Sequence, residues 1–104
     1  MTQILIVEDI AETRTWLAGL AREAFPDLQR IELAATMRAA LAAIKRESYD
    51  IALIDLGLPD GSGVEVLRAL RQRSPEALCV VTTVLGDDAH IISALSAGAN
   101  GYLL

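Results

Sequence analysis

The sequence has few aromatic residues, and this shortage restricts how its core can be built. Its 104 residues include one Trp, two Tyr and one Phe, whereas 53% of all residues are hydrophobic. The core therefore has to be aliphatic, and its many alanines suit helices that lie close to a sheet. We expect one domain, because domains most often contain about 100–150 residues.

Cysteine is scarce as well. Cys79 is the single cysteine, so the sequence offers no internal disulfide and no CxxC or Cys/His cluster for zinc. We interpret this as typical of a cytoplasmic protein in a reducing compartment. No stretch approaches about 18 consecutive apolar residues, and no basic region precedes one, so we expect neither membrane insertion nor secretion.

Positive charge is in the minority. Nine Lys and Arg residues face fourteen Asp and Glu residues, which gives a formal net charge of −5. The basic residues are scattered, whereas phosphate backbones are bound by clustered Lys and Arg. We therefore expect no direct nucleic-acid binding by this domain.

Five short apolar runs predict strands, and helical spacing fills the intervals between them. The runs cover residues 4–7, 30–34, 51–54, 78–81 and 101–104. Strands that alternate with helices indicate an α/β fold with a parallel sheet and right-handed connections. Five such strands favour a flavodoxin-like, doubly wound sheet of order 2-1-3-4-5, an order taken from the fold class rather than from the sequence.

Local signals predict where the helices begin and end and which side faces the core. The boundary signals are Phe25-Pro26 after the first helix, Thr36 and Ser62 before the second and third, and Asp87-Asp88 and Gly98 around the fourth. The side chains expected to face the core are Leu17, Leu20, Ala21, Ala24, Met37, Ala40, Leu41, Ile44, Val66, Leu67, Leu70, Ile91, Ile92 and Leu95. Trp16 is expected to be partly buried.

Three acidic residues stand directly after predicted strands. Glu8 and Asp9 follow the first strand, and Asp55 follows the third. In the order 2-1-3-4-5 these strands are neighbours, and ligands bind beyond their carboxyl ends. Unit charges about 4 Å apart repel by about 4 kcal/mol at an effective dielectric constant of about 20. A hard cation would relieve this repulsion, so the three carboxylates predict a Mg²⁺ site.

The fourth predicted strand ends at the same edge with two hydroxyl side chains, Thr82 and Thr83. A cation, a nucleophilic carboxylate and a hydroxyl donor suit phosphoryl transfer, in which catalysis is mainly positioning and charge neutralisation. Asp55 could accept the phosphoryl group as an aspartyl phosphate.

Four segments, in order and across almost the whole chain, resemble the receiver domains of bacterial two-component response regulators. They are ILIVED at 4–9, YDIALIDLGLPDGSG at 49–63, VVTT at 80–83 and ALSAGANGYLL at 94–104. The resemblance implies a signalling domain rather than an enzyme, with at most self-catalysed phosphoryl transfer and autodephosphorylation. It implies that Asp55 takes a phosphoryl group from a sensor histidine kinase. Glu8, Asp9, Asp55 and the backbone carbonyl of Gly57 would hold Mg²⁺.

The resemblance also implies a conformational switch. Thr83 matches the family's switch hydroxyl, because it stands 15 residues before Gly98 of the Ala-Gly-Ala turn. Tyr102 matches the aromatic residue that moves inward when the hydroxyl is drawn toward the phosphoryl group. The run 97–104 resembles receivers that precede a DNA-binding helix-turn-helix domain, which implies transcription control by the full-length protein.

The C-terminal end departs from the family pattern. The family has a Lys directly after the fifth strand and then a fifth helix, whereas this sequence ends at Leu104. We therefore expect residues 1–104 to be a receiver domain truncated before that helix. An uncovered apolar face drives association, so we expect a dimer, through the fourth helix and fifth strand or through the bare face.

Other interpretations remain open. Asp55 could be the nucleophile of a metal-dependent phosphohydrolase, although such enzymes generally need an acid two residues later, where Gly57 stands, and a capping segment. The chain could also be a receiver-like module that is never phosphorylated and works by contact alone. Glu8 and Asp9 could simply be a polar strand end, and Tyr102 could fill a gap at the sheet edge.

Overall fold

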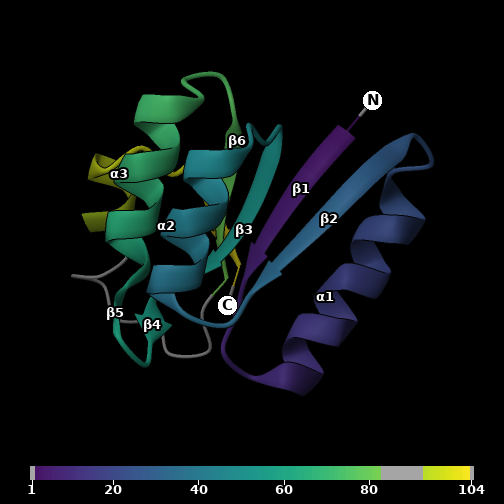
Figure 1. Cartoon of the computed structure of the whole chain (residues 1–104), viewed down its shortest axis with the longest axis horizontal. Helices are drawn as coiled ribbons and strands as arrows, with labels where there is room; N and C mark the ends of the chain where they lie inside the picture. The colour runs from purple at the N-terminus through teal and green to yellow at the C-terminus, as the bar shows by residue number, and fades with distance from the viewer. Residues whose placement is uncertain (1, 83–92, 104) are drawn as a thin grey trace.

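The computed structural model describes residues 2–82 and 93–103, in which strands and helices alternate (Figure 1). The strands are β1 (Thr2–Val7), β2 (Leu28–Ala34), β3 (Ile51–Asp55), β4 (Gly57–Leu58), β5 (Gly61–Ser62), β6 (Leu78–Thr82) and β7 (Gly101–Leu103). The helices are α1 (Ala11–Ala24), α2 (Met37–Arg46) and α3 (Gly63–Arg73). Residues 93–96 are helical as well. Within these ranges no helix combines the length and the apolar character needed to span a bilayer.

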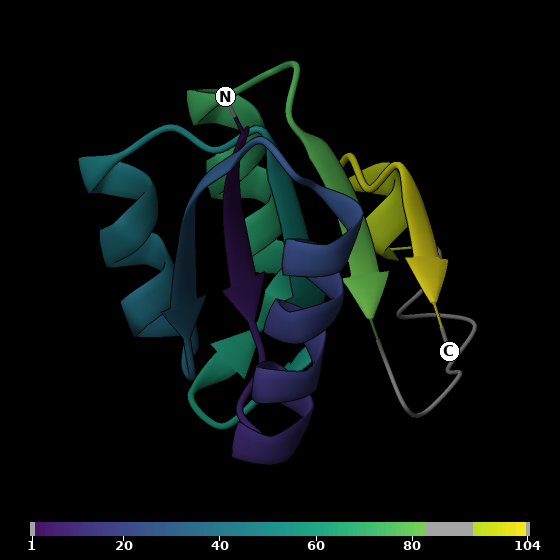
Figure 2. The ribbon, with the colours of Figure 1, turned by 90° about the vertical axis from the view of Figure 1, so that its right-hand side faces the viewer.

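The strands form a five-stranded sheet of order β2-β1-β3-β6-β7, and every neighbouring pair is parallel. Since β6 and β7 are the fourth and fifth predicted strands, the flavodoxin-like order 2-1-3-4-5 is confirmed. Figures 1 and 2 show α1 on one face of the sheet and α2 and α3 on the other. A short antiparallel hairpin of β4 and β5, which was not predicted, interrupts the connection from β3 to α3.

The sheet separates two apolar clusters, because successive side chains of a strand point to opposite faces. In β1, Ile4 and Ile6 pack with residues of α1, whereas Leu5 and Val7 join the larger cluster under α2 and α3. All four side chains are at most 1% exposed. A strand buried on both faces reads as a continuous apolar run, which is why such runs predicted the sheet.

The predicted helix boundaries within the described ranges are confirmed. The Thr36 hydroxyl accepts a hydrogen bond from the Ala39 N–H at 3.0 Å, and the Ser62 hydroxyl accepts one from the Val64 N–H at 3.1 Å. Helix α1 ends at Ala24, directly before Phe25-Pro26.

Gly98 ends the fourth helix as predicted. It has a φ of 114°, a value that favours glycine. Its N–H donates to the Leu95 carbonyl at 3.2 Å, and the Ala99 N–H donates to the Ala94 carbonyl at 2.9 Å. These two bonds form a Schellman cap. The other fourth-helix predictions, Asp87-Asp88, Ile91 and Ile92, lie outside the described residues.

Several side chains expected inside are exposed, and these predictions were wrong. Leu20 is 43% exposed and Ala24 is exposed, because α1 contacts the sheet through Leu17, Ala18 and Ala21 instead. The small side chains of Ala18 and Ala21 let α1 lie close to the sheet. Leu20 lies on the flank of the helix, and Ala24 is its last residue.

Trp16 and Leu95 are corrected in the same way. Trp16 is 63% exposed rather than partly buried, because it precedes the buried Leu17 by about 100° of helix rotation. Leu95 is 46% exposed, because its neighbour Ala94, at 1%, occupies the buried position.

Candidate functional site

The three acidic residues meet at the carboxyl edge of the sheet. Val7 of β1 is in register with Ile54 of β3, so the residues that follow them, Glu8 and Asp55, stand side by side. Glu8, Asp9 and Asp55 each offer a carboxylate oxygen, and these oxygens all lie within 4.8 Å of one another. The predicted convergence of these three side chains is therefore present in the structure.

The three carboxylates differ in burial. Glu8 is only 3% exposed, and burial together with the charge of Asp55 raises its pKa to about 7. Asp55 is half-buried, and burial also raises its pKa, although a hydrogen bond from the Gly57 N–H acts in the opposite direction. Asp9 is exposed. Burial is thus the first cause of both raised pKa values, and repulsion from the neighbouring carboxylates adds to it.

Hydrogen bonds hold both the backbone and the side chain of Glu8. The Glu8 N–H donates to the Ala34 carbonyl at 2.9 Å, and the Ile10 N–H donates to Glu8 Oε1 at 3.3 Å. Arg14 Nη1 donates to the Glu8 carbonyl at 2.8 Å. Arg14 thus binds the backbone, and no ion pair among the described residues reaches the three carboxylates.

The loop after Asp55 approaches the site closely. The Gly57 N–H lies 3.3 Å from Asp55 Oδ1. At Gly63 the backbone N–H donates to the Leu56 carbonyl at 3.0 Å, and a β-carbon would collide with the Asp55 carbonyl oxygen. Gly63 therefore allows the start of α3 to pack directly against the residue that carries the site. The proposed metal contact of the Gly57 carbonyl stays a prediction.

Sequence reasoning missed a further carboxylate in this loop. Asp60 Oδ1 accepts a hydrogen bond from the Met37 N–H at 2.7 Å, and Asp60 Oδ2 accepts one from the Arg38 N–H at 3.0 Å. These bonds lower the pKa of Asp60. They satisfy free N–H groups in the first turn of α2, which attract carboxylates. The turn Pro59-Asp60-Gly61 contains no signal for a partner this distant in sequence.

The hydroxyl and aromatic positions are described only in part. Thr82 is in register with Asp55, and its hydroxyl is buried without a hydrogen-bond partner among the described residues. Thr83 lies outside the described residues. The backbone of Tyr102 belongs to β7, but its side chain lies outside the described part of the structure. The roles of Thr83 and Tyr102 therefore stay predictions.

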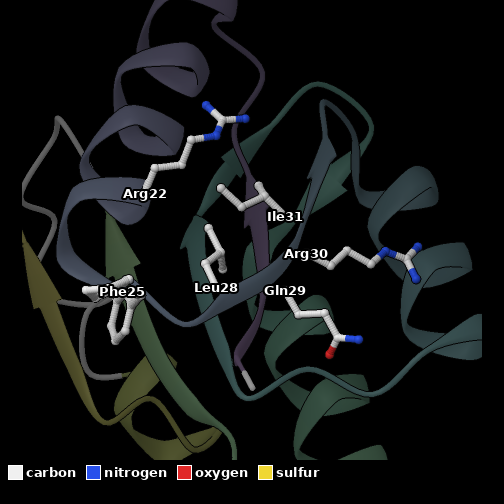
Figure 3. A pocket seen from close by; sticks show the side chains of 7 residues that line it. Arg22, Phe25, Leu28, Gln29, Arg30 and Ile31 are labelled. Carbon is white, nitrogen blue, oxygen red and sulfur yellow. The ribbon is translucent and has the colours of Figure 1, made fainter.

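The acidic cluster lies on an open edge and not in the pocket drawn in Figure 3. That pocket has a volume of about 360 Å³ and lies between the end of α1 and β2. Leu28 and Ile31 point into the space below Arg22, while Phe25 stands at its side. None of the three acidic residues lines this pocket.

The donor set suits a hard divalent cation. Three carboxylate oxygens within 4.8 Å of one another match the oxygen ligands that Mg²⁺ and Ca²⁺ prefer. A cation there would favour the ionised form of Glu8 and Asp55 and so oppose the effect of burial on their pKa values. The chemistry of the residues present thus fits a metal-assisted reaction at Asp55.

Comparison with known proteins finds relatives among transcriptional regulators. The transcriptional activator DevR/DosR of Mycobacterium tuberculosis is 33% identical over 104 residues, which is all of this chain and 48% of that protein. The chain spans about half the length of the curated relatives it matches.

Two solved structures are similar as well. A response regulator of Burkholderia pseudomallei, with a phosphorylated aspartic acid and a calcium ion, has a TM-score of 0.87 and 26% identity, covering 99% of this chain and 59% of that one. A CheY-like receiver domain of Methanospirillum hungatei has a TM-score of 0.83 and 30% identity, covering 99% and 80%. The sequence model of the response regulator receiver domain matches residues 4–104, which include the whole acidic edge, and the chain belongs to this family.

Proposed function

We propose that Asp55 accepts a phosphoryl group from a phosphohistidine of a sensor kinase, and that this event switches the output of a two-component response regulator. The observation that carries the proposal is the convergence of Glu8, Asp9 and Asp55 within 4.8 Å. Membership of the receiver family supports it, as does the phosphorylated aspartic acid of the Burkholderia relative. The role is signalling, and the kinase is the expected partner.

In the proposed step an Asp55 carboxylate oxygen attacks phosphorus, so that an O–P bond forms and the N–P bond of the phosphohistidine breaks. The leaving imidazole keeps the bonding electrons and takes up a proton. Glu8, Asp9, Asp55 and the Gly57 carbonyl would hold Mg²⁺, which would supply positive charge to neutralise the phosphoryl oxygens. The Gly57 N–H, 3.3 Å from Asp55 Oδ1, orients the acceptor carboxylate.

The conformational response to phosphorylation is inferred from the same resemblance. Thr83 is the switch hydroxyl and Tyr102 the aromatic residue that responds to it. We infer that residues 1–104 form one cytoplasmic receiver domain and that the full-length protein regulates transcription. The DNA-binding relative DevR/DosR, of which the match covers 48%, supports this. Any DNA binding would then belong to a separate domain.

We also propose a dimer, through the fourth helix and β7 or through the sheet face beside α1. Leu78 supports the second alternative, since it is 46% exposed and in register with Ile51, which packs in the cluster under α1. Light scattering of the concentrated protein tests this, and a strictly monomeric species would contradict it.

Phosphorylation is tested with acetyl phosphate and Mg²⁺ by intact mass spectrometry. We expect one phosphoryl group per chain in the native protein and none in D55N. Asp50→Asn is the matched control, because Asp50 accepts the Gln3 N–H at 2.8 Å at the opposite edge, and asparagine keeps an acceptor there. Phosphorylation of D55N would refute the assignment. Many turnovers on small phosphomonoesters would instead favour the phosphohydrolase interpretation.

A further inference from the structure

A second surface feature lies between α2 and α3, away from the acidic edge. It is an open groove of about 420 Å³, lined by Leu41, Ile44, Lys45, Ala69, Gln72 and Arg73. In Figure 1 the two helices run side by side on the face of the sheet that α1 does not cover. Glu8, Asp9 and Asp55 do not line this groove.

The floor of the groove is aliphatic. Ile44 is 3% exposed, Leu41 is half-buried, and Ala69 packs against the main apolar cluster. Because Ala69 has a single methyl group, α3 does not fill the space beside Leu41. An apolar strip is therefore left between the helices, where a side chain from another molecule would be removed from water.

The rim of the groove is positively charged. Lys45 and Arg73 are exposed and stand in the last turns of α2 and α3. Neither forms an ion pair with the residues that the structure describes, whereas the nearby Arg46 and Arg68 pair with Glu32 at 3.0 Å and Glu65 at 2.6 Å. Two cations without an ion-pair partner among the described residues thus flank one apolar strip, in a chain of net charge −5.

The helix dipole accounts for only part of this arrangement. Cations are favoured in the last turn of a helix because the free carbonyls there carry partial negative charge. This explains why basic residues stand at positions 45 and 73, but it does not account for the aliphatic groove between them. The combination of an apolar floor and a basic rim matches a ligand with an apolar stripe flanked by carboxylates.

We propose that this groove docks an acidic amphipathic helix from a partner protein. Apolar side chains at every third or fourth position would contact Leu41, Ile44 and Ala69, and flanking Glu or Asp residues would pair with Lys45 and Arg73. Charge complementarity favours such a helix over helix α1 of a second copy. Helix α1, with its exposed Trp16, carries two acidic and two basic residues and so no net charge.

The test uses a synthetic peptide of about 16 residues, long enough for partial helicity. It carries Leu at every third or fourth position with Glu beside them, and a matched peptide carries Lys in place of each Glu. Binding to the isotope-labelled protein is followed by NMR. We expect shifts at Leu41, Ile44 and Ala69 with the Glu peptide, and no binding of the Lys peptide.

Charge-reversal variants separate the groove from the rest of the surface. K45E/R73E should weaken the Glu peptide about tenfold, because two exposed ion pairs become repulsive. Arg22→Glu, in the last turn of α1, is the matched control and should bind as the native protein does. The proposal fails if the Glu peptide does not bind, if both peptides bind equally, or if K45E/R73E leaves the affinity unchanged. If the free protein self-associates and K45E/R73E abolishes this association, the groove binds a second copy of the chain, and the proposal is overturned.

Discussion

Substitution of Gly63 by alanine tests how closely the start of α3 packs against the site. A β-carbon at Gly63 would collide with the Asp55 carbonyl oxygen and lie 2.9 Å from Leu56 Cα and from Ile54 Cγ2. Two of these three atoms belong to the backbone and cannot rotate away. The loop that carries Asp55 therefore has to shift to accept a methyl group.

The magnitude follows from two opposing terms. Overpacking of a tight site costs about 1–3 kcal/mol, whereas replacing glycine stabilises by about 0.4–1 kcal/mol through the unfolded state. We expect G63A to lower the free energy of unfolding by about 1–2 kcal/mol, and hence the Tm by roughly 4 to 16 °C. Phosphorylation by acetyl phosphate should slow as well, because the displaced backbone belongs to Asp55.

Two other glycines serve as controls. A β-carbon at Gly19, within α1, or at Gly57, in the same loop as Gly63, would meet no atom within 4 Å. G19A should therefore raise the free energy of unfolding by about 0.5–1 kcal/mol, since glycine destabilises a helix interior. G57A should leave the free energy of unfolding unchanged or raise it by up to about 1 kcal/mol, because only the unfolded-state term applies there. Urea unfolding followed by circular dichroism measures all three. If G63A proves as stable as the native protein, the close approach does not constrain the loop.

Three further predictions concern charge and packing. Without metal, stability should fall as the pH rises from about 4.5 to about 7, because folding raises the pKa of Glu8 from 4.5 to about 7 and the native state then binds more protons than the unfolded chain. E8Q should flatten this slope in urea titrations, and a native protein without the slope would contradict the burial argument. D60A should lower the free energy of unfolding at neutral pH and lower it less in acid. Folding lowers the pKa of Asp60, so the stabilisation by its carboxylate is lost as the pH falls through that lowered value. An equal loss of stability at pH 7 and pH 3 would argue against a charged cap. L67A should cost about 2–5 kcal/mol in the same assay, since Leu67 is 0% exposed, and a loss below 1 kcal/mol would show that the core repacks around it.

Much of the architecture was accessible from the sequence because buried parallel strands are short apolar runs. All five strand predictions agree with the structure within two residues at each end. The convergence of Glu8 and Asp55 followed from their positions after the first and third strands together with the assumed strand order, since residues after neighbouring parallel strands reach the same edge. The strand order came from the fold class, because periodicity does not determine which strands pair.

The misses have physical causes as well. Helical spacing defines an apolar side but not the angle at which that side meets the sheet, which is why Leu20 and Leu95 were placed inside. Asp60 was missed because its partners in α2 are more than twenty positions earlier in the chain. A turn carboxylate acquires such partners only when tertiary packing brings a helix N-terminus beside it.

The contact between Asp60 and α2 makes one helix dependent on the loop that follows Asp55. The carboxylate bonds to the N–H groups of Met37 and Arg38, so a change of loop conformation that withdraws it leaves two donors unpaired. The near end of α2 then has to follow the loop or fray. The proposed phosphorylation of Asp55 would in this way reach α2, a helix that does not contact the phosphoryl group.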